Sequence, residues 1–214
     1  MQVYAAYWAA LEVRDLGRVL GVVGDLRAHG WSSTEVIEGL VVPAQTRVGE
    51  LWLSGILPIS GEHAMTSINE AVVASLSGDD PDGGTGPPVV VACLDPEEHV
   101  LAAAVVAIEL RALGAPVHLV PDTVTAGELV RTVERLAGRA VLLSVTMASS
   151  LVSCRAVLRD LHEASIPVVV GGRAWGAESG RALTWGASHA PTVPAAWRLL
   201  AGPPKLLTTG SASD

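Results

Sequence analysis

The chain has 214 residues, of which 50% are apolar and 17% charged, and its formal net charge is −8. This composition supports a buried core and excludes a disordered chain. The excess of acidic residues argues against autonomous nucleic-acid binding, which needs clustered Lys and Arg. Cys93 and Cys154 show no CxxC spacing, so neither a disulfide framework nor a zinc site is expected. Without a leader or a membrane-length apolar run, we expect a cytoplasmic protein that does not bind membranes.

The first half of the chain has the apolar spacing of helices. Apolar residues recur at helical intervals over 3–27, and a capping box from Ser32 to Glu35 opens a second helix. Pro43 is expected to kink or split that second helix, because proline lacks the amide hydrogen that a helix interior needs. A third helical stretch covers 62–76. The first half is therefore expected to form a small helical bundle.

The second half alternates short β-branched runs with amphipathic segments. The runs lie at 89–93, 117–120, 141–145 and 168–170, with a weaker one at 187–190. The amphipathic segments lie at 99–113, 126–137, 150–164 and 175–185. This order predicts a flavodoxin-like (Rossmann-like) domain with a five-stranded parallel sheet, and an α + α/β chain overall. The expected parts are a bundle, a Gly- and Pro-rich linker, the sheet domain and a disordered tail, at residues 1–76, 77–88, 89–204 and 205–214.

Residues that follow the predicted strands are the candidates for ligand binding, because open α/β sheets bind ligands at the carboxyl ends of their strands. His99 follows the first strand and is placed to ligate a metal, with Glu97 able to orient its other ring nitrogen. One imidazole is enough only for a metal that arrives already chelated. The chain has no GxGxxG after the first strand and no GxxxxGK[ST], so a nucleotide site is not expected. Taken alone, His99 would be a surface histidine at a helix start.

Three motifs in the second half resemble, in order and spacing, the signature of cobalamin-binding domains: Glu97-x-His99-x-x-Ala102, Ser144-x-Thr146 and Gly171-Gly172. The resemblance implies that His99 is the lower ligand of cobalt and displaces the cofactor's own dimethylbenzimidazole. It also implies that the released tail lies in a slot lined by the second and third motifs. Two positions depart from the usual signature, since Glu97 replaces Asp and Ala102 replaces Gly.

A second set of residues lies in the helical half. Trp52 precedes Glu62 and His63 across a turn that contains glycine and proline. Alone, Trp52 would be a core residue and Glu62 a first-turn carboxylate that stabilises its helix. Beside a cobalamin domain, the set resembles the bundle motif of CarH-type photoreceptors, and the resemblance covers about residues 30–200. It implies that these three side chains contact the adenosyl group of adenosylcobalamin, and that light breaks the cobalt–carbon bond, moves the bundle and changes assembly.

One departure from that family concerns the residue after Trp52. The photoreceptors have a histidine there that reaches cobalt after photolysis, whereas this chain has Leu53. The resemblance does not extend to the DNA-reading module that the CarH-type repressors carry. It therefore implies output through a signalling partner protein or through the chain's own homo-oligomer. Two alternatives stay open: a corrinoid protein that carries methyl groups between methyltransferases, and a module that stores or delivers cobalamin. If the chain is a light sensor of this kind, it is a signalling module and not an enzyme.

The sequence also resembles photocobilins, which pair cobalamin with a bilin. Aromatic and basic residues of the helical half could line a pocket for biliverdin and pair with its propionates: Tyr4, Tyr7, Trp8, Trp31, Arg14, Arg18 and Arg47. The alternative is that this aromatic stripe forms the core of the bundle.

Overall fold

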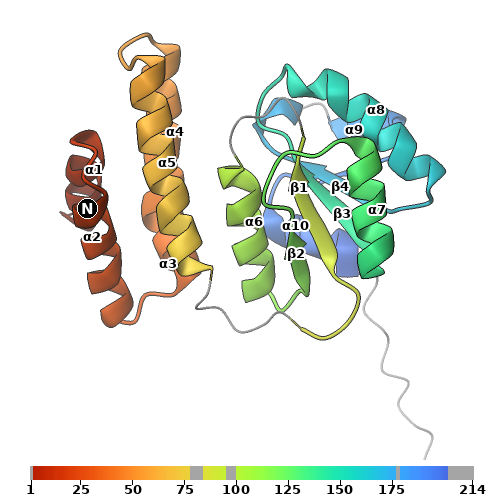
Figure 1. The fold of residues 1–214 in the computed structure, drawn as a ribbon, viewed down its shortest axis with the longest axis horizontal. Helices are drawn as coiled ribbons and strands as arrows, with labels where there is room; N and C mark the ends of the chain where they lie inside the picture. Colours follow the sequence, from red (N-terminus) through yellow and green to blue (C-terminus); the bar gives the residue numbers. More distant parts are fainter. Residues whose placement is uncertain (1, 78–83, 95–99, 177–178, 202–214) are drawn as a thin grey trace, which may run out of the picture.

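The chain folds into a helical bundle beside an α/β domain (Figure 1), as expected for an α + α/β protein. The computed structural model describes residues 2–77, 84–94, 100–176 and 179–201. The predicted tail over 205–214 and half of the predicted linker lie outside these ranges. Within them, no helix is both long and apolar enough to cross a lipid bilayer.

The bundle begins with two helices, α1 (Gln2–Glu12) and α2 (Leu16–Ala28), where the spacing over 3–27 suggested one. That interpretation was wrong, because the chain turns at Arg14, whose φ is 57°. Asp15 then caps α2, since its side chain accepts a hydrogen bond of 3.0 Å from the backbone N–H of Arg18. The apolar period alone does not reveal this turn, since it continues across the break.

The second predicted helix is continuous but changes its winding. The capping box is confirmed, with Ser32 N–H donating to Glu35 at 2.7 Å and Glu35 N–H donating to Ser32 Oγ at 3.1 Å. The helix then comprises α3 (Ser33–Val36), a π-helical segment η1 (Ile37–Val41) and α4 (Val42–Leu53). The wider turn just before Pro43 fits a residue that has no N–H to donate. The predicted effect of Pro43 is therefore seen as a π-helical segment. The last helix of the bundle is α5 (Ile59–Leu76).

The sheet is parallel throughout, in the order β2-β1-β3-β4-β5. Its strands are β1 (Val89–Cys93), β2 (Val117–Leu119), β3 (Ala140–Ser144), β4 (Val168–Gly171) and β5 (Ser188–His189). Its helices are α6 (Leu101–Ala112), α7 (Ala126–Leu136), α8 (Ser150–Glu163), α9 (Ser179–Thr184) and α10 (Val193–Ala201). The helix expected over 175–185 is shorter than predicted, because Trp175 is buried in the 3₁₀ turn η2 (Arg173–Trp175). This strand order has its switch point between β1 and β3, where flavodoxin-like sheets bind ligands.

Helix α6 belongs to both halves of the molecule. Figure 1 shows it between α5 and the sheet. Leu101 and Ile108 are buried in the core of the bundle, whereas Ala103 and Leu110 are buried against the sheet. A helix that is apolar on two sides is typical of a buried element. The bundle is thereby held against the α/β domain by side chains from the latter's own first helix.

Glu109 of α6 makes the stability of the chain depend on pH. Burial, with a smaller contribution from the negative charge of Glu38 on η1, raises the pKa of Glu109 to about 7. Above its ordinary value and up to about 7, the folded state binds more protons than the unfolded state, so stability falls as pH rises through this window. We expect Glu109→Gln to raise the free energy of unfolding at pH 8 by about 1–2 kcal/mol after allowance for solvent screening, as measured by urea unfolding.

The control for this prediction is Glu38→Gln, which removes only the lesser cause of the shift. It should raise stability at pH 8 by a smaller amount than Glu109→Gln. At pH 4, where Glu109 is protonated, Glu109→Gln should not differ from wild type in this way. A Glu109→Gln gain that is equal at pH 4 and pH 8 would contradict the assignment.

The aromatic stripe of the bundle is part of its core. Tyr7 and Trp8 are 0% and 5% exposed, and the Arg47 guanidinium lies 4.0 Å from the centre of the Trp8 ring. Tyr4 and Trp31 pack against the same core. The rings of Tyr7 and Trp8 are enclosed by neighbouring side chains, and a bilin pocket lined by these aromatic residues stays a prediction. The structural alternative, a bundle core, describes them.

Candidate functional site

The carboxyl ends of three strands meet at one edge of the sheet. In the register of the sheet, Ser144 at the end of β3 lies between Cys93 of β1 and Gly171 of β4. Side chains that are far apart in sequence are therefore neighbours at the switch point between β1 and β3. Glu97 and His99 come shortly after β1 in sequence, but both lie outside the described residues.

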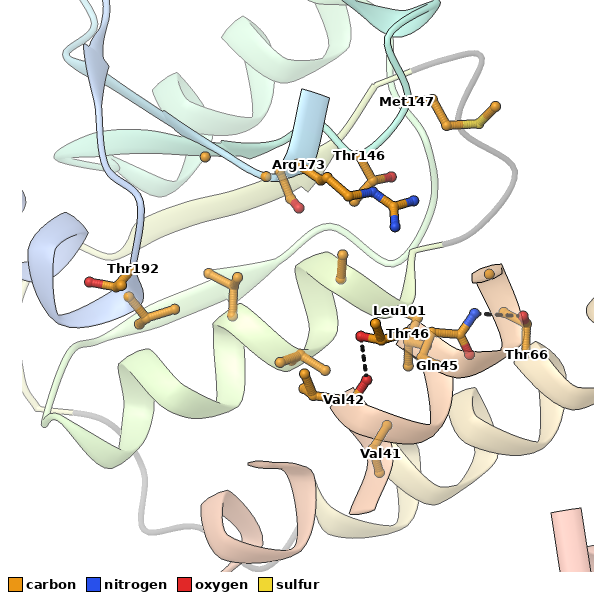
Figure 2. Close-up of a pocket in the computed structure, with 18 of the residues that line it drawn as sticks. Val41, Val42, Gln45, Thr46, Thr66, Leu101, Thr146, Met147, Arg173 and Thr192 are labelled. Carbon is orange, nitrogen blue, oxygen red and sulfur yellow. Dashed lines mark hydrogen bonds between the residues drawn. The ribbon is translucent and has the colours of Figure 1, made fainter. Parts of the chain in front are cut away.

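A cavity of about 670 Å³ lies between this edge and the bundle (Figure 2). Its walls come from η1, α4 and α5 on the bundle side, and from α6, α10 and the ends of β3 and β4 on the other. Seven of the nine predicted site residues line it: Trp52, Glu62, His63, Ser144, Thr146, Gly171 and Gly172. The two sets of residues that the sequence placed in separate halves therefore face one space.

The α/β side of the cavity contains a narrow apolar slot. Leu142 and Ser144 lie two residues apart on β3, so they share one face of the sheet, as Val169 and Gly171 do on β4. The same face is covered by α6 and α10, which contribute small apolar side chains to the lining. Ser144 is 3% exposed, and it lines the cavity at the end of β3. A buried hydroxyl of this kind is suited to a polar atom of a ligand.

The glycine pair shapes the floor of the slot. Gly172 has a φ of 102° and a ψ of 163°, a combination that is essentially restricted to glycine. A Cβ atom there would lie 2.2 Å from the carbonyl oxygen of Val145. At Gly171, a Cβ would lie 3.2 Å from the carbonyl oxygen of Ala190. The pair thus lets three backbone segments approach one another where β4 ends.

The bundle side presents an aromatic ring and a carboxylate. Trp52, in the last turn of α4, lines the cavity and is 40% exposed. Glu62 and His63 lie in the first turn of α5. Glu62 Oε1 accepts a hydrogen bond of 2.7 Å from the Thr66 hydroxyl, while Oε2 lies 3.5 Å from His63 Nε2. The Glu62 side chain is 14% exposed and that of His63 45% exposed, so the carboxylate is held in place more firmly than the imidazole.

Several polar lining residues were not singled out from the sequence. Gln45 and Thr66 face each other across α4 and α5, with Gln45 Nε2 donating to Thr66 Oγ1 at 2.8 Å (Figure 2). Figure 2 also shows Arg173 extending from the segment after β4 into the space between the sheet edge and the bundle. Arg173 directly follows the glycine pair, and that position was the signal that could have identified it. It provides a positive charge at the rim of the slot.

Comparison with known proteins finds a family match in each half of the chain. Residues 87–187 match the B12 binding domain family, and residues 3–77 match a second family that is also described as a B12 binding domain. Each half of the chain is thus similar to a B12 binding domain. The cobalamin prediction drawn from the three motifs is thereby supported at the level of the cofactor.

This cobalamin-binding protein is 32% identical over 169 residues to the HTH-type transcriptional repressor CarH of Myxococcus xanthus. The match covers 78% of this chain and 56% of the repressor, so the chain spans about half the length of that curated relative. Its fold is similar to that of the monomethylamine corrinoid protein of Methanosarcina barkeri, with a TM-score of 0.72 and 15% identity. That likeness covers 90% of this chain and 94% of the corrinoid protein and confirms the predicted fold class.

The residues on the cavity walls fit a cobalamin. The cavity is mainly apolar and is enclosed jointly by the two regions that match B12 binding domains. It contains the buried hydroxyl of Ser144 and a glycine pair that lets the backbone at the end of β4 lie close to Val145 and Ala190. A mostly apolar pocket with a few placed polar groups is typical of a cofactor site.

Proposed function

We propose that this chain is an adenosylcobalamin-dependent light sensor in which loss of the adenosyl group changes conformation or assembly. One observation carries the proposal: Trp52, Glu62 and His63 of the bundle line the same cavity as the Ser144 and Gly171 motifs of the sheet. The similarity to CarH, which extends over both domains, supports it. The chain is then a signalling module whose output passes to its own oligomer or to a partner protein.

The α/β side holds the lower part of the cofactor in this proposal. His99 is the ligand of cobalt, and Glu97 orients its ring. The Ser144 hydroxyl donates to a nitrogen of the displaced base in the slot, where Leu142 and Val169 exclude water. The glycine pair lets the backbone at the end of β4 lie close to Val145 and Ala190 beside the slot. When bound, adenosylcobalamin supplies a cobalt–carbon bond that light can break.

The bundle side recognises the upper ligand. Trp52 presents its ring to the cavity for stacking, and base–aromatic stacking contributes on the order of 1–3 kcal/mol. Glu62 accepts hydrogen bonds from ligand hydroxyls, and His63 contacts the same group from the neighbouring position. Leu53, which is 69% exposed and is not a wall residue, leaves no imidazole next to Trp52 to replace the lost upper ligand.

The test is reconstitution of the purified chain with adenosylcobalamin in the dark, followed by green light, with absorbance spectra and gel filtration before and after. We expect a cobalt-centred spectral change accompanied by a change in elution volume, because the contacts that favour one packing are lost with the adenosyl group. A parallel sample with biliverdin tests the second chromophore, and a retained red band would show that it binds.

Two controls separate this proposal from its alternative. His99→Ala should give a spectrum without a protein-derived lower ligand, and an unchanged spectrum would remove His99 from the site. Methylcobalamin should bind more weakly than adenosylcobalamin. Equal affinity for the two cofactors, together with an elution volume that light does not alter, would instead identify a corrinoid methyl carrier.

A further inference from the structure

A continuous series of hydrogen bonds crosses the bundle from α1 to the cavity. Tyr7 Oη donates to Asn69 Oδ1 at 2.8 Å, and Asn69 Nδ2 donates to Gln45 Oε1 at 2.8 Å. Gln45 Nε2 then donates to Thr66 Oγ1 at 2.8 Å, and Thr66 Oγ1 donates to Glu62 Oε1 at 2.7 Å. The side chains of four helical residues therefore connect the Glu62 carboxylate at the cavity to α1.

The direction of this series follows from its last member. A carboxylate accepts hydrogen bonds and donates none, so the Thr66 hydroxyl must donate to Glu62. Thr66 Oγ1 then accepts from the amide nitrogen of Gln45, which turns the Gln45 oxygen toward Asn69. Asn69 donates in the same way and turns its own oxygen toward the Tyr7 hydroxyl. Every donor consequently points toward Glu62, and aligned hydrogen bonds of this kind strengthen one another.

The series lies where polar groups are costly. Tyr7, Thr66 and Asn69 are each 0% exposed and are surrounded by the apolar core of the bundle. Burial, with a smaller effect from Tyr4, raises the pKa of Tyr7, so its hydroxyl stays protonated and remains a donor. Apolar side chains of similar shape would fill the same space at little or no loss of stability. Packing alone does not require four polar side chains that are linked by hydrogen bonds and lead to the cavity.

We infer that Tyr7, Asn69, Gln45 and Thr66 are positioning residues that fix the Glu62 carboxylate toward the upper ligand of the cofactor. The inference rests on the proposed function, since it gives Glu62 a partner in the adenosyl group. Oε1 is held by Thr66, Oε2 lies 3.5 Å from His63 Nε2, and both Glu62 and His63 line the cavity. Removal of the first donor, at Tyr7, weakens this hold although Tyr7 is not a wall residue of the cavity.

The experiment compares dissociation constants of adenosylcobalamin and methylcobalamin, in the dark, for wild type, Tyr7→Phe and Thr66→Val. Each variant removes one hydroxyl with little change of shape. We expect the preference for adenosylcobalamin to fall by about 3- to 10-fold in each variant, the effect of one typical hydrogen bond, while methylcobalamin affinity stays the same in Tyr7→Phe, which does not alter the cavity wall. Tyr4→Phe is the matched control, because Tyr4 is on the same helix and outside the series, and it should retain the wild-type preference.

If these residues act in folding alone, their loss would weaken the binding of both cofactors equally or of neither. The ratio of the two dissociation constants therefore separates a positioning role from a role in stability. Combination with Glu62→Gln gives a second readout, since Tyr7→Phe should add little once the carboxylate is gone. A wild-type preference that is retained in both Tyr7→Phe and Thr66→Val would overturn the inference and leave the proposed function intact. Absence of any preference in wild type would overturn the proposed function, and the inference with it.

Discussion

Gly172→Ala is expected to lower the free energy of unfolding by about 3 kcal/mol or more. The backbone of Gly172, with a φ of 102°, lies in a region that other residues rarely adopt. The new Cβ would also lie 2.2 Å from the Val145 carbonyl oxygen and 2.7 Å from its carbonyl carbon. The obstacle is backbone and not a side chain that could rotate away, so β4 and the segment after β3 would have to separate. Urea unfolding monitored by circular dichroism measures the loss.

The matched control is Gly180→Ala in α9 of the same domain. Nothing lies within 4 Å of a Cβ built at Gly180, and its φ does not fall in the positive range. Alanine in a helix is more favourable than glycine, so this variant should be as stable as wild type or slightly more stable. Gly172→Ala should also bind cobalamin less tightly, because the separated segments carry Thr146 and Gly171. Equal stability of the two variants would contradict the role assigned to Gly172.

Trp52→Ala is expected to reduce the preference for adenosylcobalamin over methylcobalamin by about 10- to 100-fold, which corresponds to loss of one stacked ring. Trp52 is 40% exposed, and none of the core clusters among the described residues includes it. Its truncation should therefore alter stability little, so a change in affinity can be attributed to the cofactor. Isothermal titration with both cofactors in the dark measures the preference.

Leu53→Ala is the control for Trp52, because Leu53 is its neighbour in the chain, is 69% exposed and is not a wall residue of the cavity. It should bind both cofactors as wild type does. Trp52→Phe keeps an aromatic face and should restore part of the preference. If Trp52→Ala discriminates between the two cofactors as well as wild type does, the ring does not contact the adenosyl group.

The arrangement of the α/β domain could be predicted from the sequence because its strands are buried on both faces. Runs such as Val89–Cys93 and Ala140–Ser144 are almost wholly apolar, and the helices between them leave few alternatives to a parallel sheet. The placement of Ser144 and Gly171 at one sheet edge follows from that order. The weak fifth strand is only Ser188–His189, and α10 after it was not predicted.

Other features depend on contacts that no local pattern encodes. The break between α1 and α2 rests on one capping aspartate, Asp15, within an unbroken apolar period. The hydrogen bond between Tyr7 and Asn69 joins residues 62 positions apart, and each taken alone is typical of an ordinary helix. Tyr7 and Trp8 suggested a pocket because aromatic residues suit both a core and a ligand site, and only burial distinguishes the two.

The sharing of α6 between two cores restricts how the chain can respond to a ligand. Separation of the domains would expose Leu101 and Ile108 to water, which costs on the order of 3–6 kcal/mol. A ligand can drive that change only if it binds the separated form more tightly by at least as much. In the turn between α4 and α5, Leu53, Ile56 and Ile59 are 60–73% exposed already, and Leu57 packs against the bundle core. A shift of this turn past the cavity therefore uncovers less apolar surface than separation of the domains does.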